Sequence, residues 1–308
     1  MRLGLVGLGR MGGNMVHRLV AHGHQVVGYD LDESNVAQAE EVGAERSASL
    51  EEMVTILGRP RAVWVMVPHG GPTRKTVGAL LGLLDDDDVL VDGGNSHFPE
   101  SVAHARKARE IGVHFLDVGV SGGIWGRDIG YCMMIGGAEA AVQRLDPLFQ
   151  ALAPEAGYAH VGGSGAGHFV KMVHNAIEYA MLQALAEGFE CLHASDFALD
   201  LKQVAGVWQH GSVIRSWLLE LLSRAFDEEG NELVDVGSWV DDSGTGRWTV
   251  DYALEKALPV PAIAGALFQR FDSRIEKRFA HKTIAALRNQ FGGHEVKRTG
   301  RDGEGRGG

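Results

Sequence analysis

The chain has 308 residues, of which 45% are hydrophobic and 22% are charged, and its formal net charge is −11. Such a length holds two domains with separate cores, and such a composition is globular rather than disordered. The negative charge and the lack of any run of about 18 apolar residues disfavour nucleic acid and membrane as partners, while only two cysteines, far apart in the chain, favour a reducing cytoplasm.

The elements expected at the start of the chain are a strand, a glycine-rich turn, a helix and a second strand, over 2–6, 7–12, 13–22 and 25–29. The turn carries Gly7, Gly9 and Gly12 in the spacing G-x-G-x-x-G. In a nucleotide-binding unit, the first glycine permits the tight turn, the second lets the backbone approach a pyrophosphate, and the third lets helix and strand pack closely. The phosphates then lie at the N-terminus of the helix. This order of elements predicts a Rossmann domain.

Asp30 closes the second strand, 18 positions after Gly12. A carboxylate at this place can accept hydrogen bonds from both ribose hydroxyls of a dinucleotide, and it would repel a 2′-phosphate. Asp32 and Glu33 add further negative charge. The sequence therefore predicts NAD as the cofactor, with NADP less favoured. The residues expected to bind it are Gly7, Leu8, Gly9, Arg10, Met11, Gly12, Asp30, Val67, Pro68 and Asn95.

Further strand-like runs continue the α/β alternation, and they cover 62–67, 89–92, 114–118, 131–135 and 159–161. Ligands of such folds bind beyond the carboxyl ends of the strands. In this chain glycine-rich loops follow three of the runs, at 68–71, 93–96 and 121–123. Each loop taken alone could be an ordinary turn. The aspartates at 85–88 are interpreted as a solvated loop without chemistry.

The pattern changes after residue 162, where strands give way to helices expected over 166–194, 202–209, 212–226, 250–257, 262–271 and 275–290. The predicted fold class is α/β, an N-terminal Rossmann dinucleotide-binding domain followed by an all-α C-terminal domain. The expected boundaries are 1–162 for the NAD-binding domain, 163–296 for a helical substrate and oligomerisation domain, and 297–308 for a flexible tail.

The first helix of the second half carries a charged stripe in apolar surroundings. Its members are spaced i, i+3, i+4 and i+7, which places them on one face; they are Lys171, His174, Asn175 and Glu178. Apolar neighbours such as Ile177 are expected to pack inward. Lysine and glutamate are rarely buried unless they are paired or functional, so the stripe indicates proton-transfer chemistry. A polar stripe that simply faces water is about equally favoured by this segment alone.

Seven segments of the chain carry family signatures. In chain order they begin at Gly7, Val91, Ser121, Gly167, Ile214, Gly244 and Arg288, and they read GLGRMGGNM, VDGGNS, SGG, GHFVKMVHNAIEY, IRSWLL, GTGRWT and RNQFGGH. Together they resemble the decarboxylating 6-phosphogluconate dehydrogenases, specifically their short bacterial form within the β-hydroxyacid dehydrogenase superfamily. One segment would prove little, whereas seven in the family's order are specific.

This resemblance implies oxidation of the C3 hydroxyl of 6-phosphogluconate, a phosphorylated sugar acid, and loss of CO2 to give ribulose 5-phosphate, a step of the pentose phosphate pathway that needs no metal. Lys171 would be the general base, which requires a pKa below the ordinary value of about 10.4, and would then stabilise the enolate. Glu178 would protonate C1. The implied catalytic residues are Lys171, Glu178, His174 and Asn175. The implied substrate-binding residues are Asn95, Ser121, Gly122, Gly123, His174, Asn175, Tyr179, Arg247, Thr249, Arg270, Arg288 and His294.

The chain departs from the longer members of the resembled family at several points. Arg247 stands where these often have lysine, Ala176 and Ala180 replace glycines, and much of the longer helical domain is missing. In the longer members, the final arginine and histidine come from a partner subunit. Whether Arg288 and His294 act in their own subunit or across an interface is therefore open. Apolar helices favour a homodimer or a homotetramer.

Two other functions compete with this interpretation. The 3-hydroxyisobutyrate and tartronate-semialdehyde dehydrogenases resemble the chain in the Rossmann start, the SGG loop and the helix lysine, but they do not call for His174 and Glu178. A non-catalytic NAD-binding sensor on the same fold is the second alternative, since fold does not dictate function. The presence of both Lys171 and Glu178 disfavours it.

Overall fold

The computed structural model describes residues 1–293 and 295–297, so His294 and residues 298–308 of the predicted tail lie outside the described residues. Its contacts divide the chain into two units. Unit 1 comprises Met1–Met181 and Gly244–Ile263, and unit 2 comprises Leu182–Ser243 and the chain from Ala264 onward. The chain after residue 162 therefore contributes to both units. The expected domain boundary at residue 162 stays a prediction.

Unit 1 is built on a sheet of eight strands in the order β3-β2-β1-β4-β5-β6-β7-β8. They are β1 (Arg2–Val6), β2 (Gln25–Tyr29), β3 (Glu45–Arg46), β4 (Ala62–Val65), β5 (Val89–Asp92), β6 (His114–Ser121), β7 (Cys132–Gly137) and β8 (Tyr158–Gly162). Neighbouring strands are parallel except for β6 and β7. The chain order reverses beside β1, which has β2 on one side and β4 on the other, and ligands of open α/β sheets bind at this point.

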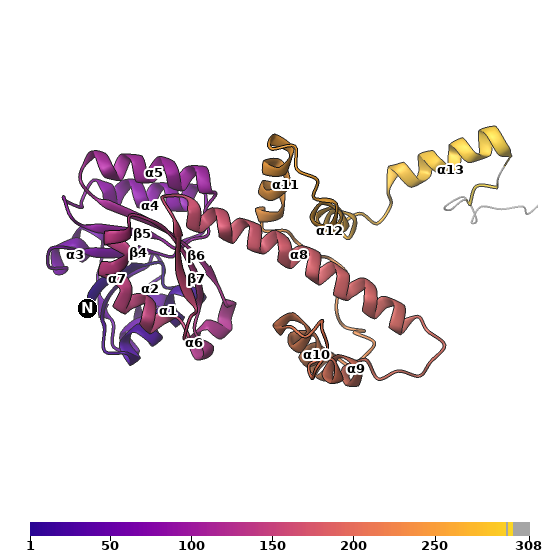
Figure 1. Ribbon diagram of the computed structural model, residues 1–308, viewed down its shortest axis with the longest axis horizontal. Helices are drawn as coiled ribbons and strands as arrows, with labels where there is room; N and C mark the ends of the chain where they lie inside the picture. Colours follow the sequence, from indigo (N-terminus) through magenta and orange to yellow (C-terminus); the bar gives the residue numbers. More distant parts are fainter. Residues whose placement is uncertain (294, 298–308) are drawn as a thin grey trace, which may run out of the picture. The chain divides into compact units, whose positions relative to one another are not determined.

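Helices cover both faces of the sheet (Figure 1). One face carries α3 (Leu50–Ile56), α4 (Gly71–Leu81) and α5 (Phe98–Glu110), and the other carries α1 (Arg10–Ala21), α2 (Glu33–Glu41) and α7 (Glu139–Leu152). The remaining elements of unit 1 are the 3-10 turn η1 (Gly123–Trp125), α6 (Gly126–Ile129), the first part of α8 (Ala166–His193) and α11 (Thr245–Glu255). The sheet thus forms the middle of three layers, and its strand ends are left for the site.

The core of unit 1 follows from the period of two in its strands. Trp64 belongs to the cluster of α1, α2 and α7, whereas Val63 and Val65, on either side of it, belong to the cluster of α3, α4 and α5. Successive side chains of a strand point to opposite faces, so a strand that is covered on both faces is apolar throughout. Such runs are visible in the sequence, and the predicted fold class is confirmed.

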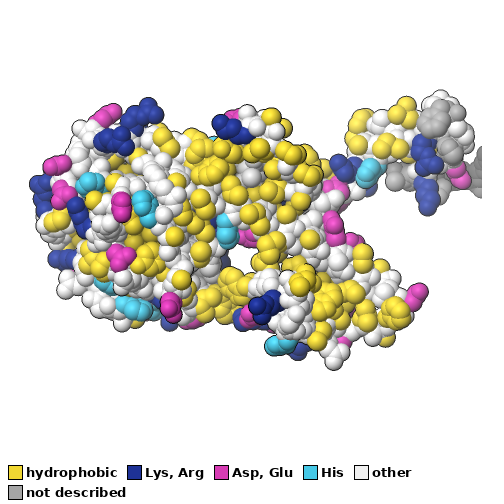
Figure 2. Space-filling model, in the orientation of Figure 1, with side chains coloured by type: hydrophobic (Ala, Val, Ile, Leu, Met, Phe, Trp, Pro, Cys, Tyr) yellow, Lys and Arg dark blue, Asp and Glu magenta, His cyan; other side chains and the backbone are white. Residues whose placement is uncertain are grey.

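Unit 2 is helical in the part of the chain that is described, with α9 (Leu201–Val207), α10 (Trp217–Glu229), most of α12 (Pro261–Asp272) and α13 (Phe279–Gly292). Its small core joins the end of α8 to α9 and α10, and it contains Phe189, Leu201, Ala205, Leu219 and Phe226. Many other apolar side chains of this unit are exposed, including Phe268 at 61% and Phe279 at 82%, and apolar side chains gather on the helices in Figure 2. None of the described helices is long and apolar enough to cross a membrane.

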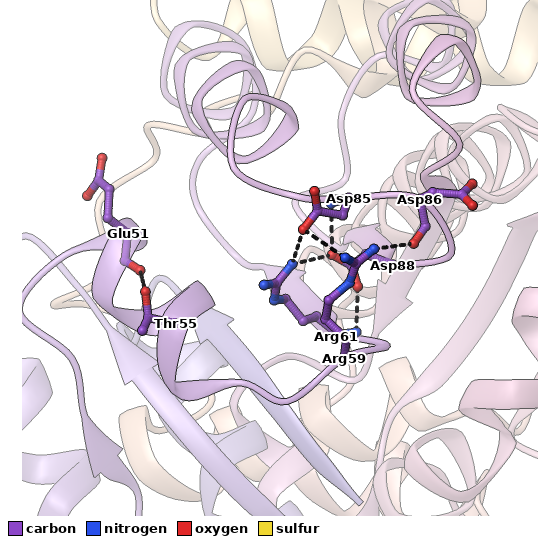
Figure 3. A network of polar contacts seen from close by, with 7 residues as sticks. All are labelled: Glu51, Thr55, Arg59, Arg61, Asp85, Asp86 and Asp88. Atoms are coloured by element: carbon purple, nitrogen blue, oxygen red, sulfur yellow. Dashed lines mark hydrogen bonds and ion pairs between the residues drawn. The ribbon is translucent and has the colours of Figure 1, made fainter.

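The aspartates at 85–88, before β5, were expected to form a solvated loop, but part of this run is buried and makes polar contacts (Figure 3). Asp88 is fully buried. Its carboxylate accepts hydrogen bonds from the backbone N–H groups of Arg61 at 2.7 Å and Asp85 at 2.9 Å, and the Arg61 guanidinium lies 2.9 Å from it. A buried charge needs such partners. The run therefore joins the start of β4 to the start of β5, at the amino ends of these strands. The site lies at their opposite, carboxyl ends.

Candidate active site

The turn between β1 and α1 is shaped by its glycines. Gly7 has a φ of +91°, which favours glycine. A Cβ on Gly12 would lie 1.9 Å from the Gly7 carbonyl oxygen, so α1 can approach the turn only without a side chain there. A Cβ on Gly9 would meet no atom of the described residues within 4 Å. Packing therefore does not explain the glycine at position 9, and the open space beside the N-terminus of α1 suits a phosphate group.

A pocket of about 560 Å³ opens between this turn, the end of β2 and the loops after β4 and β5. Of the predicted cofactor-binding residues, those that line it are Gly7, Gly9, Arg10, Met11, Gly12, Asp30, Val67, Pro68 and Asn95. Leu8 does not line it and is buried. Gly93 and Gly94, from the glycine-rich loop expected beyond the end of a strand, also line it. Lining residues that sequence reasoning missed are Val6, Tyr29, Leu31, Met66 and Pro72, and no local pattern distinguishes these from core and turn residues.

The carboxylate of Asp30 is held in place by the backbone. It accepts hydrogen bonds from the N–H of Leu8 at 2.6 Å and from the N–H of Asp32 at 2.8 Å. These bonds join the end of β2 to the glycine-rich turn. The two donors fix the direction of the carboxylate at the pocket wall, and each of its oxygens retains capacity to accept a further bond.

The loop after β5 is tightly constrained. The buried carboxylate of Asp92 accepts hydrogen bonds from the N–H of Gly94 at 2.9 Å and the hydroxyl of Ser96 at 2.8 Å. A Cβ on Gly93 would lie 2.3 Å from the Trp64 indole nitrogen. The side-chain amide of Asn95 pairs twice with the backbone of Val120, donating to its carbonyl at 3.2 Å and accepting from its N–H at 2.9 Å. Asn95 thereby joins the pocket wall to the end of β6.

Helix α8 crosses β6 and β7 at very short range. A Cβ on Gly167 would lie 2.2 Å from the Asp117 carbonyl oxygen, and one on Gly119 would lie 2.4 Å from the Cβ of Lys171. A Cβ on Gly136 would lie 2.6 Å from the backbone nitrogen of Gly167. Because three glycines remove these side chains, the helix backbone rests almost directly on the strands. Lys171 is thus placed over β6.

Lys171 is only 5% exposed. Burial lowers the pKa of its amine from 10.5 to about 8, and the nearby Glu178 and Cys132, which act in the opposite direction, only partly offset this effect. A lysine with this pKa is uncharged in a substantial fraction of molecules at mildly alkaline pH. It can therefore accept a proton, which an ordinary surface lysine rarely does.

Polar contacts connect this amine to the end of β6. The Lys171 Nζ lies 3.4 Å from Nδ1 of His174, and this ring nitrogen lies 3.0 Å from the amide oxygen of Asn175. The other ring nitrogen of His174 lies 3.4 Å from the hydroxyl of Ser121. Ser121 follows Val120, to which the pocket residue Asn95 is bonded. The amine and the pocket wall therefore belong to one continuous set of contacts.

The rest of the predicted stripe lies on the next turns of α8. Glu178 is half-buried and Tyr179 is buried, while Gly122 and Gly123 follow Ser121 with φ values of +120° and +55°. Ile177 is 49% exposed, so the expectation that it packs inward was wrong. Within unit 1 it faces away from the strands that bury Lys171, because a helix only one side of which is covered leaves its opposite side open.

Helix α11 brings further predicted residues into unit 1. Thr249 is buried, and its hydroxyl donates hydrogen bonds to the carbonyls of Met172 at 3.3 Å and Thr245 at 3.0 Å, which holds α11 against α8. Arg247 is exposed on the same helix. Between them in sequence, Trp248 stacks on His97 with ring centroids 4.6 Å apart. Sequence reasoning missed this stack, for which the chain offers no local signal.

The other predicted substrate-binding residues belong to unit 2 or lie outside the described residues. The Arg270 guanidinium donates a hydrogen bond to the carbonyl of Asp241 at 2.7 Å. Arg288 is exposed on α13. His294 lies outside the described residues. Among the residues that the structure describes, no group of three or more histidine, cysteine or acidic side chains is arranged to hold a metal ion.

Two family models match the chain. The NAD binding domain of 6-phosphogluconate dehydrogenase matches residues 2–162, and the C-terminal domain of 6-phosphogluconate dehydrogenase matches residues 191–306. A Haloferax volcanii protein named NAD(+)-dependent, decarboxylating 6-phosphogluconate dehydrogenase is 48% identical over 97% of this chain and 99% of its own length. A Lactococcus lactis 6-phosphogluconate dehydrogenase is 34% identical over 94% of this chain, but this covers only 65% of that longer protein.

Solved structures agree with these matches. A Plasmodium falciparum 6-phosphogluconate dehydrogenase, studied with NADP+ and with 6-phosphogluconate, superposes with a TM-score of 0.80 at 25% identity, covering 99% of this chain and 67% of that one. A 3-hydroxyisobutyrate dehydrogenase from Mycobacterium tuberculosis superposes with a TM-score of 0.69 at 22% identity, covering 86% of this chain and 90% of that one. The second likeness shows a common fold only.

Proposed function

The chain belongs to the 6-phosphogluconate dehydrogenase family, and we propose that it catalyses the oxidative decarboxylation of 6-phosphogluconate to ribulose 5-phosphate and CO2, with NAD as the hydride acceptor. The observation that carries this proposal is the buried amine of Lys171, which a continuous set of polar contacts joins to the wall of the predicted cofactor pocket. The reaction belongs to the pentose phosphate pathway, and we place the enzyme in the cytoplasm.

The pocket fits a nicotinamide dinucleotide. Gly9 leaves open space next to the N-terminus of α1, where a pyrophosphate would be bound, and Asp30 offers carboxylate oxygens to a ribose. A nicotinamide bound in this pocket would supply the acceptor for the hydride that leaves C3 of the substrate. The residues of the chain then have to orient the substrate and move its protons.

Lys171 acts first as a base. With a pKa of about 8, its neutral amine accepts the proton of the C3 hydroxyl while that carbon is oxidised to a ketone. The resulting ammonium ion lies in a site from which water is largely excluded, where a charge interacts strongly. It therefore stabilises the negative oxygen that develops as the carboxylate leaves as CO2. His174, which contacts the amine, orients the substrate oxygens together with Asn175 and Ser121.

Glu178 completes the reaction in this proposal. It lies seven residues after Lys171 on the same face of α8. After CO2 has left, the enediol must be protonated at C1, and Glu178 delivers that proton. For the phosphate of the substrate we propose Tyr179, Arg247 and Thr249 from unit 1. Arg270, Arg288 and His294 are proposed as further phosphate-binding residues, with Arg288 and His294 supplied either in cis or by a partner.

We propose a homodimer or a homotetramer as the active form. The exposed aromatic side chains of unit 2, Trp239 at 64%, Phe268 at 61% and Phe279 at 82%, support an interface between subunits, because large exposed apolar surfaces are usually covered by a partner. Light scattering coupled to size-exclusion chromatography gives the mass directly. A monomer at all protein concentrations would refute this part of the proposal.

The preference for NAD is argued from Asp30, and the printed name of the Haloferax volcanii relative agrees with it. We expect Asp30→Asn to lower the ratio of kcat/KM with NAD to that with NADP by about tenfold or more, because the amide neither repels a 2′-phosphate nor binds two ribose hydroxyls as well. Asp32→Asn is the matched control, since Asp32 caps α2, and it should change the ratio by less than about threefold. Wild-type protein that prefers NADP, or an unchanged ratio in Asp30→Asn, would contradict the assignment.

The proposed activity is tested by adding 6-phosphogluconate to the purified protein with NAD and, separately, with NADP, while nicotinamide reduction and released CO2 are both measured. One CO2 should appear for each reduced nicotinamide. Oxidation of 3-hydroxyisobutyrate without any CO2 from 6-phosphogluconate would establish the rival dehydrogenase. Binding of NAD without turnover of either acid would establish a non-catalytic protein.

A further inference from the structure

Asp117 is a fully buried aspartate. In the contacts described, its carboxylate accepts hydrogen bonds from backbone N–H groups only. One oxygen accepts a hydrogen bond from the N–H of Gly165 at 2.6 Å, and the other accepts one from the N–H of His168 at 2.9 Å. Gly165 immediately precedes α8 and His168 is its third residue, so both amides lie at the N-terminus of the helix, where N–H groups have no partner within the helix. A strand residue thus caps a helix that follows it by almost fifty positions in the chain.

His168 ties the same turn of α8 to a second element. It is 1% exposed, and its Nδ1 lies 2.7 Å from the hydroxyl of Ser101, a buried residue of α5. The first turn of α8 is therefore held from β6 by Asp117 and from α5 by Ser101. Neither residue belongs to the charged stripe or lines the cofactor pocket, so the proposed reaction does not otherwise account for them.

This fixed turn determines where Lys171 lies. Lys171 follows His168 by three residues and so lies on the same side of the helix. Asp117 and Gly119 are two apart in β6 and point to the same face of the sheet, and Gly119 is the residue over which the Cβ of Lys171 passes. The close contacts of Gly167 with the Asp117 carbonyl and of Gly136 with Gly167 leave no space between the helix backbone and the strands where they cross. A shift of α8 along β6 would therefore carry the amine with it.

We propose that Asp117 is a positioning residue for the reaction: by binding the N–H groups of Gly165 and His168 at the N-terminus of α8, it fixes the helix on β6 and thereby holds the Lys171 amine in its buried place beside His174. This inference rests on the proposed function for its effect on turnover. The placement of the amine itself can be measured without any substrate.

The isosteric variant Asp117→Asn separates the two acceptor oxygens. An asparagine side chain keeps one acceptor, but its NH2 group would face a backbone N–H of α8 and could not accept from it. The first turn should then loosen, and water should reach the Lys171 amine. Because burial is the main reason why the pKa of Lys171 is low, this pKa should move upward toward 10.5. Glu178, Cys132 and His174, which face the amine, remain in the variant, so the change reports on burial.

Asp88→Asn is the matched control. Asp88 is also fully buried and also accepts hydrogen bonds from two backbone N–H groups. It lies, however, just before the first residue of β5, at the amino ends of the strands and away from α8. Both variants should unfold at lower temperature than the wild type, since each leaves a buried donor without its acceptor. Only Asp117→Asn should change the amine.

The experiment measures the pKa of Lys171 from the pH dependence of its acetylation by acetic anhydride, with the modified peptide quantified by mass spectrometry. We expect Asp117→Asn to raise it by about half a unit or more and Asp88→Asn to leave it unchanged. In the steady state, Asp117→Asn should lower kcat by about tenfold or more, while the dissociation constant of NAD stays within about twofold. An unchanged pKa of Lys171 in Asp117→Asn, with stability lost as in Asp88→Asn, would overturn the proposal.

If Asp117→Asn does not fold, Ser101→Ala decides by the same readouts. It removes the partner of the His168 ring without touching the backbone donors, so the pKa of Lys171 should rise by a smaller amount and kcat should fall about threefold. No change in either quantity would overturn the proposal. Should wild-type protein fail to turn over 6-phosphogluconate, the proposed function fails, while the acetylation measurement still decides whether Asp117 places the amine.

Discussion

Lys171→Met is expected to lower kcat by roughly 10³–10⁴-fold, because the variant loses both the base that accepts the C3 proton and the cation that stabilises the departing electrons. NAD binding should persist, since Lys171 does not line the cofactor pocket. Methionine has nearly the same length as lysine and is tolerated in a buried place. The loss should therefore reflect chemistry rather than misfolding.

The same variant should be more stable than the wild type. The amine has a pKa of about 8 in the folded protein and 10.5 as its ordinary value, so the unfolded state binds the proton more tightly. Burying the charged amine then costs roughly 3 kcal/mol below pH 8, and this cost disappears as the pH rises through 10.5. We expect Lys171→Met to raise the free energy of unfolding by roughly 1–3 kcal/mol at pH 7, a range that allows for the loss of the polar contacts of the amine. The increase should become progressively smaller at higher pH.

Kinetics and urea unfolding at several pH values measure both effects. Lys107→Met is the control, because Lys107 is exposed on α5, and a surface substitution of this kind should change kcat little and stability by no more than about 0.5 kcal/mol. Near-normal turnover in Lys171→Met would exclude this residue as the base. A variant that is less stable than the wild type at pH 7 would show that the amine is not buried as described.

Gly9→Ala is expected to abolish most of the affinity for NAD without harming the fold. The φ of Gly9 is −59°, outside the left-handed region that favours glycine, and a Cβ at this position would meet no atom of the described residues within 4 Å. A bound pyrophosphate would occupy that space, so the added methyl group should raise the dissociation constant about 10–100-fold. Isothermal titration with NAD measures the loss, and thermal unfolding without NAD should match the wild type.

Two other glycines show that this effect belongs to the position. In Gly12→Ala the new Cβ would lie 1.9 Å from a backbone oxygen, so this variant should lose about 3 kcal/mol or more of stability. Gly78→Ala, in α4, meets nothing within 4 Å and should gain about 0.5–1 kcal/mol. NAD binding by Gly9→Ala at wild-type strength would mean that the pyrophosphate does not approach this turn.

The Rossmann half could be predicted because its signals are local. The glycines of the first turn, the apolar strands and Asp30 lie close together in sequence, and each has a steric or electrostatic reason that neighbouring residues already determine. The stripe on α8 could be predicted for the same reason, since a helix face follows from spacing. How deeply its side chains are buried could not be predicted. That Lys171 is buried and Ile177 exposed depends on which strands the helix crosses.

The features that were missed depend on partners far away in the chain. Asp117 looks like a polar interruption of a strand until α8 supplies the amides that it binds. Asp88 looks like part of a charged run until Arg61 is brought beside it. The start of α11 was expected at residue 250, because apolar spacing begins there, but Gly244 in the left-handed conformation lets the helix begin at Thr245.

The most direct test of the role of Lys171 is the pH dependence of kcat/KM for 6-phosphogluconate in the wild-type enzyme. If the free amine is the base, kcat/KM rises with pH and levels off above a pKa of about 8, and the residual activity of Lys171→Met lacks this rise. A value of kcat/KM that is constant between about pH 6 and pH 9 would contradict the account, because no group with the pKa of the buried amine would then have to lose its proton before the reaction.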